Sequence, residues 1–385
     1  MDIEALPVTR PPKHHFFGYY EKCPWDASGR TMLAGEVDFM DRDPEEDDVL
    51  TVGVIDLQDD GRFAPIARTT AWHWQVGCRL QWLGEPPAQK VLYNDRRDGR
   101  LVSVLRDADG GGERVLPLPV AEVSHDGQTV VVPDMHRVHR YRPGYGIATT
   151  IEYALEERAP EDQGIYRMDI ATGAFEQIVS LAEVAAFEAI EESRRSHHWI
   201  NHLVFTPSDR RFAFLHRYTH PEKAGRWMTR MFTVNPDGSD LFLLNPEPMT
   251  SHFDWLDDEH LLAWAEHDGQ DAYYLFTDRS REVVPVGLEH FQTDGHCSFS
   301  PDRRWMLTDT YPDRKDSKRA LILYRWPDGP RIDIGRFFSP PELGGAKRCD
   351  LHPRWNRDGT QICIDSAHDG SRQMYVLDVD RIVRA

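Results

Sequence analysis

The chain has 385 residues, of which 40% are hydrophobic, so it can bury a substantial core and global disorder is excluded. Its 45 basic residues against 64 acidic ones leave a formal net charge of −19, which argues against binding to nucleic acid or an anionic membrane, because both require clustered positive charge. An acidic small molecule is not excluded, since it needs only a local basic site.

The N-terminal segment MDIEALPVTRPPKHHFF has neither an apolar stretch nor a cleavage-site pattern, so no secretory signal is expected. The sequence has no run of about 18 apolar residues, and no transmembrane helix is predicted. The five cysteines are sparse and form no CxxC motif, which indicates reduced thiols and argues against a zinc finger. We therefore expect a cytoplasmic protein.

Along the chain, one plan repeats: two short strands joined by a turn that usually contains Asp or Gly. Apolar runs on both sides of such a turn are hairpin signals, since Asp and Gly tolerate the geometry of a tight turn. Seven segments follow this plan, starting near residues 23, 79, 121, 202, 252, 296 and 352. A second pair of strands follows each hairpin, as in GIYRMDIATGAFEQIVS and MFTVNPDGSDLFLLN. Four strands in each repeat of roughly 40–55 residues indicate the blades of a β-propeller.

We predict an all-β fold, with residues 1–385 forming a single seven-bladed propeller of four antiparallel strands per blade. The third blade is lengthened by an insertion at residues 135–163 and by a helix-like stretch at residues 181–196. The seventh repeat ends after RQMYVLDVD without a fourth strand. We expect residues 3–9 to supply that strand and close the ring, which leaves no edge strand exposed. The dipeptides of WD40 repeats do not recur, so a WD40 array is not predicted.

In four successive blades a histidine stands three positions before the aromatic residue of the innermost strand. These are His202 in HLVF, His252 in HFDW, His296 in HCSF and His352 in HPRW. The innermost strands of a propeller line its central channel, so these equivalent positions are expected to converge at one mouth. Imidazoles held close together share a metal ion, lower each other's pKa, or do both. With carboxylates nearby they favour a first-row divalent ion, and carboxylate and water ligands favour manganese.

The same alignment brings charged residues to this mouth. Asp350 and Arg354 lie on either side of His352. In the insertion, MHRVHRYRPGYG offers Arg142 as a carboxylate clamp and Tyr145 as a phenolic acid or base. Long loops on a rigid scaffold often carry function. The alternative for this segment is a solvated basic loop on an acidic protein.

Further candidates are polar residues expected to bind substrate. The segment AWHWQVG places His73 and Gln75 just before the second innermost strand, and His139 and Arg217 complete the group. Simpler interpretations exist for such residues. A single histidine can bind the backbone of a neighbouring blade, and aromatic residues near a channel mouth can serve to pack the blades together.

Several segments resemble oligogalacturonate lyases, and the resemblance extends over nearly the whole chain in the same blade order. They are YEKCPWDASGRTMLAG, NHLVFTPSD, SHFDWLDD and DLHPRWNRDGTQICIDSAHDG. The resemblance implies a seven-bladed propeller that cleaves uronate oligosaccharides by β-elimination, with manganese at the channel mouth. By position it makes His202 the base, His252 and His352 two metal ligands, and His296 a neighbour at the same mouth. Lyases acting on ulvan and on rhamnose–glucuronate linkages are related propellers, and the chain could equally belong with them.

The chain departs from the family pattern at two places. Asp350 stands where the family has a histidine two residues before the last ligand. The family's glutamine ligand falls near Lys347 or Arg348, neither of which can bind a metal. An arginine that supplies the positive charge in place of a metal is therefore an alternative.

The expected chemistry explains these residue types. β-Elimination removes the proton beside the uronate carboxylate, which requires a divalent ion or an arginine to neutralise the developing charge. A neutral histidine, its pKa held down by nearby cations, takes this proton near neutral pH. We expect His202 to be this base and Arg142 or Arg354 to grip the carboxylate. The expected ligands of the divalent ion, with Mn²⁺ preferred, are His252, His296, Asp350 and His352.

Two other functions are compatible with the sequence. A metal-dependent hydrolase or isomerase of a small sugar acid would use metal-activated water. A non-catalytic propeller could serve as an interaction platform, since one fold hosts many functions. The four histidines in register argue against a platform, which needs no imidazoles around its axis. The expected partner is an acidic oligosaccharide rather than nucleic acid or membrane, while the linkage and the oligomeric state are not determined by the sequence.

Overall fold

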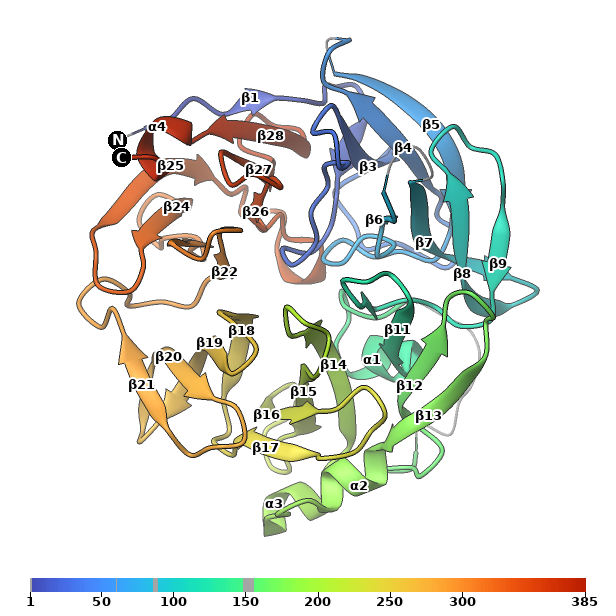
Figure 1. The fold of residues 1–385 in the computed structure, drawn as a ribbon, viewed down its shortest axis with the longest axis vertical. Helices are drawn as coiled ribbons and strands as arrows, with labels where there is room; N and C mark the ends of the chain where they lie inside the picture. The colour runs from blue at the N-terminus through green and yellow to red at the C-terminus, as the bar shows by residue number, and fades with distance from the viewer. Residues whose placement is uncertain (1, 60, 86–88, 148–155) are drawn as a thin grey trace. The chain divides into compact units, whose positions relative to one another are not determined.

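The computed structural model describes residues 2–59, 61–85, 89–147 and 156–385. The strands in these residues form seven four-stranded antiparallel sheets (Figure 1). The fold is a seven-bladed β-propeller, and the all-β class and the four strands per blade predicted from the repeats are confirmed. The chain divides into two compact units: unit 1 is Met1–Leu116 with Thr293–Ala385, and unit 2 is Pro117–Gln292.

Unit 1 holds four of the described sheets. The first consists of β2 (His14–Phe16), β3 (Thr31–Val37), β4 (Leu50–Asp56) and β5 (Arg62–Thr69). The second consists of β6 (Gln81–Leu83), β7 (Lys90–Arg97), β8 (Arg100–Asp107) and β9 (Arg114–Leu116). The third consists of β22 (Ser298–Phe299), β23 (Trp305–Asp309), β24 (Lys318–Arg325) and β25 (Arg331–Phe338). The fourth consists of β26 (Arg354–Trp355), β27 (Gln361–Ser366), β28 (Gln373–Asp378) and β1 (Leu6–Pro7).

The last of these sheets joins the two ends of the chain. Leu6 lies opposite Val376 and Pro7 opposite Tyr375 in an antiparallel pair, which places β1 beside β28 (Figure 1). The Val8 amide also donates to the Met374 carbonyl at 2.9 Å. The N-terminal strand thus covers the open edge of β28, and the predicted closure of the ring is confirmed.

Unit 2 holds three sheets in its described part. The first consists of β10 (Glu122–Val123), β11 (Thr129–Pro133), β12 (Gly164–Asp169) and β13 (Phe175–Ser180). The second consists of β14 (His198–Phe205), β15 (Phe212–Thr219), β16 (Trp227–Val234) and β17 (Phe242–Asn245). The third consists of β18 (Thr250–Trp255), β19 (His260–His267), β20 (Gln270–Thr277) and β21 (Val283–Val286).

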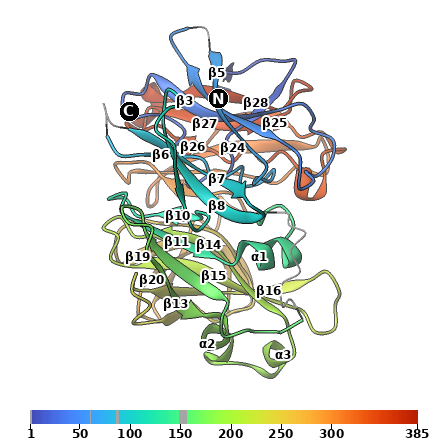
Figure 2. The ribbon, with the colours of Figure 1, turned by 90° about the vertical axis from the view of Figure 1, so that its right-hand side faces the viewer.

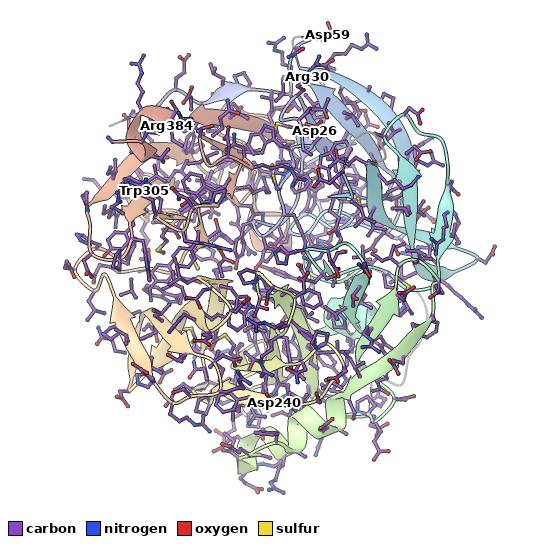
Figure 3. All side chains as sticks on the ribbon, viewed as in Figure 1. Asp26, Arg30, Asp59, Asp240, Trp305 and Arg384 are labelled. Carbon is purple, nitrogen blue, oxygen red and sulfur yellow. The ribbon has the colours of Figure 1, made fainter. Side chains whose placement is uncertain are left out.

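The hairpin turns show why Asp recurs in the repeats. Asp26 and Arg30 both belong to the turn before β3 and are labelled in Figure 3. The Asp26 carboxylate accepts from the backbone amides of Arg30 and Thr31 at 3.0 and 3.1 Å. The Ser28 hydroxyl donates to the same carboxylate at 2.6 Å. This side chain therefore replaces backbone partners within the turn, a role for which Asp is well suited.

Short helices interrupt the strands at the lengthened third repeat. The insertion begins with α1 (Met135–Tyr141), and its residues 148–155 lie outside the described part of the chain. The helix-like stretch contains α2 (Leu181–Ala186) and α3 (Glu191–Arg194), which follow β13 (Figure 2). Two further short helical segments, η1 (Gly345–Lys347) and α4 (Asp380–Val383), lie in unit 1. No helix among the described residues is long and apolar enough to span a membrane.

The blades of unit 1 are buried on both faces, as β27 illustrates. Ile362, Cys363 and Ile364 are each 0% exposed. Ile362 and Ile364 share a core cluster with Leu323 of the preceding blade. Cys363, on the opposite face, belongs to the cluster that contains Phe16 of the first blade. Both faces of β27 are therefore packed against neighbouring blades. All five cysteines of the chain are free thiols.

Candidate functional site

Three buried side chains of unit 1 come together at the starts of two innermost strands. They are His296, which precedes β22, and Asp350 and His352, which precede β26. One possible ligand atom from each lies within 4.8 Å of the others. The two imidazole rings meet edge to face, with 4.5 Å between their centroids and 88° between their planes. We call these three residues the His–Asp cluster.

The orientation of His296 is set by a carboxylate. Its Nδ1 lies 2.8 Å from Asp309 Oδ1, and its backbone amide donates to the same oxygen at 2.8 Å. Asp309 is the last residue of β23 and is buried. Because a carboxylate only accepts, Nδ1 carries a proton, so Nε2 is the ring nitrogen that a metal ion could bind. A carboxylate behind an imidazole is the usual support of a metal-binding histidine.

His352 has a strained backbone, and its buried imidazole is neutral. Its φ is 41°, in the left-handed region where a non-glycine residue is strained. Burial, then the neighbouring His296, then Arg354 and Arg348 lower its pKa well below the ordinary value, while Asp350 opposes them. Its Nε2 is buried, and no described residue forms a hydrogen bond with it. The nearest carboxylate atom recorded, Asp350 Oδ2, is 3.9 Å away. His352 is thus a neutral imidazole with an unsatisfied nitrogen.

Asp350 forms ion pairs with two arginines. Arg319 Nη2 lies 2.7 Å from its Oδ1, and Arg348 Nε lies 2.6 Å from its Oδ2. Burial raises the pKa of the Asp350 carboxyl, but Arg348 and Arg319 outweigh it and hold that pKa well below the usual range. The carboxylate is therefore ionised and fully buried, and each of its two oxygens faces one guanidinium.

Tyrosine rings surround the cluster. The Tyr19 ring is 5.0 Å from His352, and the Tyr20 ring is 5.4 Å from His296. Both tyrosines are buried, whereas Tyr311, 6.2 Å from His296, is 37% exposed. Of these three rings, that of Tyr311 is the most exposed to solvent.

Arg354, predicted to grip a carboxylate, is tied into the protein. Its Nη2 lies 2.8 Å from Asp365 Oδ2 and also donates to the Gly18 carbonyl, and its Nε donates to the Tyr19 carbonyl at 3.1 Å. Burial lowers its pKa, but Asp365 outweighs this and raises it above the ordinary value. These bonds fix the backbone that presents Tyr19.

The two predicted substrate-binding residues of unit 1 lie in a tight turn. His73 Nδ1 accepts from the Trp74 amide at 2.9 Å. Gln75 is 0% exposed, and its Nε2 donates to the carbonyls of Ala346 and Arg348 at 2.9 and 3.0 Å. Gln75 thereby fixes the backbone from which the Arg348 side chain extends.

The predicted base and a predicted ligand belong to unit 2. His202 occupies a β-bulge in β14 with φ at 52°, and its ring lies 4.3 Å from Phe253. His252 is buried in β18, and its Nδ1 is 3.2 Å from the Ser251 hydroxyl. Arg217 is a buried residue of β15 opposite Trp199. The left-handed backbone that His202 shares with His352 marks both positions as strained.

The remaining candidates lie on the insertion. Arg142 caps the C-terminus of α1, where its guanidinium lies 4.6 Å from the centre of the Tyr145 ring and 4.3 Å from that of Trp227. Tyr145 is buried. His139 is half-buried in the last turn of α1. Arg142 and Tyr145, predicted together from the sequence, are therefore in contact.

A cavity of about 510 Å³ in unit 2 contains none of the predicted site residues. Arginines line it, but they are paired with carboxylates: Arg210 Nη2 lies 2.8 Å from Asp258, and Arg211 Nε lies 2.6 Å from Asp278. Its charges are largely balanced, so we assign it no ligand.

Several solved structures are similar to this chain in fold. The chain resembles an oligogalacturonate lyase in complex with manganese, with a TM-score of 0.70 and 16% identity over 100% of this chain and 95% of that one. In fold, it is similar to oligogalacturonate lyases. The oligogalacturonate lyase of Vibrio parahaemolyticus gives a TM-score of 0.69 and 14% identity over 98% of this chain and 94% of that one. The tricorn protease, at 0.54 and 12%, covers 97% of this chain but is matched over only 35% of its own. No protein-family model and no curated protein sequence matches the chain.

Of the predicted metal ligands, His296, Asp350 and His352 lie together in unit 1, whereas His252 belongs to unit 2. Three partners of the cluster were not identified as candidates from the sequence. They are Asp309, Arg319 and Tyr311. For Asp309 a signal existed, because an aspartate stands 13 positions after His296 and again, as Asp365, 13 positions after His352.

Proposed function

We propose that the protein is a lyase that cleaves uronate-containing oligosaccharides by β-elimination. The observation that carries this proposal is the His–Asp cluster, with one imidazole oriented by Asp309 and the other neutral with an unsatisfied Nε2. It occurs in a fold similar to that of an oligogalacturonate lyase in complex with manganese. Nothing about a propeller scaffold requires this arrangement, since a buried unsatisfied nitrogen is a cost in folding.

The residues of the cluster fit a divalent cation, for which manganese is our first choice. Two imidazole nitrogens and one carboxylate within 4.8 Å of one another are donors that first-row divalent ions accept. The unsatisfied Nε2 of His352 would gain the partner that it lacks, and Asp309 supplies the support behind His296. His296, Asp350 and His352 would hold the ion, and the sequence register adds His252.

When bound, the cation supplies positive charge for the uronate carboxylate as electron density builds on it. The chain's own residues do the rest. A base takes the proton from the carbon that bears the carboxylate, and the electron pair left behind forms a carbon–carbon double bond. The bond to the glycosidic oxygen on the next carbon then breaks, and that oxygen takes up a proton. Both proton transfers need side chains whose protonation states suit neutral pH.

The assignment of these side chains rests on the sequence register and on the resemblance. His202 is our proposed base. Arg142 or Arg354 grips the carboxylate, and Tyr145 is the phenolic acid or base. Since Arg354 is bound to Asp365, its contribution in this proposal includes holding the Tyr19 backbone. The proposed contacts to the remaining sugar are made by His73, Gln75, His139 and Arg217.

The test is to incubate the purified protein with a galacturonate trimer and Mn²⁺ and to follow ultraviolet absorbance from the new double bond. We expect absorbance to rise with product formation. His202→Asn, chosen because Asn tolerates positive φ, should lower the rate at least about 100-fold, as expected for loss of a general base. The exposed histidine variant His125→Asn should match the wild type. Product without absorbance would instead indicate a hydrolase, and a near-normal rate for His202→Asn would contradict its role as base.

A further inference from the structure

The two arginines on Asp350 differ in how deeply they are buried. Arg319 lies on β24, the third strand of its blade, its side chain is 2% exposed, and its Nε donates to the Ser339 hydroxyl at 3.3 Å. Arg348 follows η1, its side chain is 17% exposed, and its Nη1 donates to the Gly345 carbonyl at 3.2 Å. One guanidinium is fixed in the core, while the other reaches Asp350 from the edge of the site.

The backbone of Arg348 is nevertheless well anchored. Gln75 donates to its carbonyl at 3.0 Å, and Arg372 donates to the neighbouring Lys347 carbonyl at 2.6 Å. Movement of the Arg348 guanidinium can therefore come from side-chain torsions alone. Such rotations are fast and need no rearrangement of the fold.

Arg348 and a metal ion compete for the Asp350 carboxylate because both are positively charged. Asp350, Asp309, Arg319 and Arg348 contribute two negative and two positive charges. A divalent cation on the cluster would leave this buried group with two uncompensated positive charges. Each Asp350 oxygen already faces a guanidinium, Arg319 at 2.7 Å and Arg348 at 2.6 Å, so a cation that binds either oxygen competes with an arginine, and Arg348 is the less buried of the two. Relief comes if Arg348 leaves Asp350 and an anion enters the site.

We propose that Arg348 is an exchangeable partner, which holds Asp350 in the absence of a cation and turns to a substrate carboxylate when the cation binds Asp350. This inference rests on the proposed function and deepens it, because it makes metal and acidic sugar bind cooperatively. The metal releases the arginine that the sugar needs, and the sugar carboxylate offsets the charge that the metal adds. By linkage, each ligand raises the affinity for the other by the same factor.

The experiment titrates full-length protein with Mn²⁺ and measures free ion by electron paramagnetic resonance, with galacturonate, neutral galactose or no sugar. We expect galacturonate to tighten Mn²⁺ binding at least about 5-fold, the lower end of typical couplings, and galactose to leave it unchanged. Arg348→Gln should bind Mn²⁺ about 10-fold more tightly without sugar and lose the effect of galacturonate. Arg348→Lys, which keeps the positive charge, should still bind Mn²⁺ weakly. The exposed control Arg336→Gln, which loses only a surface ion pair with Asp316, should behave as wild type.

The outcomes separate this inference from the proposed function. If Mn²⁺ binds wild type and Arg348→Gln equally well, or if galacturonate still tightens binding in Arg348→Gln, the exchange is wrong while the metal site stands. If none of the proteins binds Mn²⁺ with or without sugar, the metal site of the proposed function is wrong, and the exchange falls with it. Circular dichroism of each variant verifies that it is folded.

Discussion

Each of the two units buries a pair of neighbouring histidines, and the pairs differ in how their ring nitrogens are used. In unit 2, the rings of His198 and His216 are stacked, with planes 3° apart and 2.9 Å between His198 Nδ1 and His216 Nε2. In unit 1, the rings of His296 and His352 meet at 88°, and His352 Nε2 has no hydrogen-bond partner among the described residues. The first pair is fully bonded and the second is not.

The outer nitrogens of the stacked pair are also satisfied. His198 Nε2 lies 2.8 Å from the Ser193 carbonyl, and Arg230 Nη2 donates to His216 Nδ1 at 3.3 Å. Arg230 in turn donates to the Val184 carbonyl in α2 at 3.1 Å. The pair therefore belongs to a chain of hydrogen bonds that secures the helical segment beside β14.

Lowered pKa values do not distinguish the pairs. Burial lowers the pKa of His198 to about 4, and it lowers those of His216 and His352 well below the ordinary value. All three imidazoles are neutral at neutral pH. What distinguishes a candidate site from core packing is the buried ring nitrogen left without a hydrogen-bond partner.

The largest expected effect comes from a substitution in the histidine pair of unit 1. His352→Asn keeps a residue suited to φ of 41° but removes the unsatisfied nitrogen. We expect kcat/KM on a galacturonate trimer to fall at least about 1,000-fold, equivalent to about 4 kcal/mol of transition-state stabilisation. The free energy of unfolding should change by less than about 1 kcal/mol, because no hydrogen bond to Nε2 is lost. Steady-state kinetics and urea unfolding measure the two quantities.

His216→Ala should do the opposite. It leaves His198 and Arg230 each without a buried partner and opens a cavity, so it should lower the free energy of unfolding by about 3 kcal/mol. At a temperature where it remains folded, its kcat/KM should equal that of the wild type. If His216→Ala lost activity as strongly as His352→Asn while staying folded, the distinction between the pairs would be wrong.

A comparable effect on stability is expected from pH. His198 has a pKa of about 4 when folded and near 6.5 when unfolded, so the unfolded chain binds the extra proton between these values. Its contribution is therefore complete above about pH 6.5 and is lost as pH falls toward 4, amounting to about 3 kcal/mol. Urea unfolding from pH 7.5 to 4.5 measures the loss. His198→Gln should flatten this dependence, whereas the exposed His125→Gln should not, and equal slopes in all three proteins would refute the assignment.

The smallest expected effect concerns the support of the cluster. Asp309→Asn keeps the shape of the side chain but removes the charge behind His296 and can present a donor to its Nδ1. We expect Mn²⁺ affinity to fall about 10- to 100-fold, as for other carboxylates behind metal-binding histidines. Titration by electron paramagnetic resonance measures it. Unchanged affinity would mean that Asp309 serves only the fold through its bond to the His296 amide.

The fold was accessible from the sequence because its signals are local. Turn residues such as Asp26 accept hydrogen bonds from backbone amides only a few positions away. Strands joined by such turns recur along the chain, four in each repeat. Even the pairing of β1 with β28 could be predicted, because the seventh repeat lacks a strand that residues at the other end of the chain can supply. A repeat that lacks a strand, and so leaves an edge strand without a partner, can be recognised from the sequence.

The candidate site was predicted only in part, because it depends on contacts between distant segments. Register alone identified His296 and His352, and the flanking position identified Asp350. It did not reveal Arg319, which contacts Asp350 although it lies 31 positions earlier in the chain. Nor did it separate these histidines from His198 and His216, whose satisfied nitrogens appear only once β14 and β15 are paired.

By itself, the sequence determined the propeller, its seven repeats, its closure and the register of its histidines, because periodic apolar runs and turn residues act over short distances. Only the tertiary structure decided which buried nitrogens find partners. That outcome depends on the few ångströms between side chains from different strands. For His352 the packing leaves one nitrogen unsatisfied beside a carboxylate held by two arginines, and this arrangement carries both proposals.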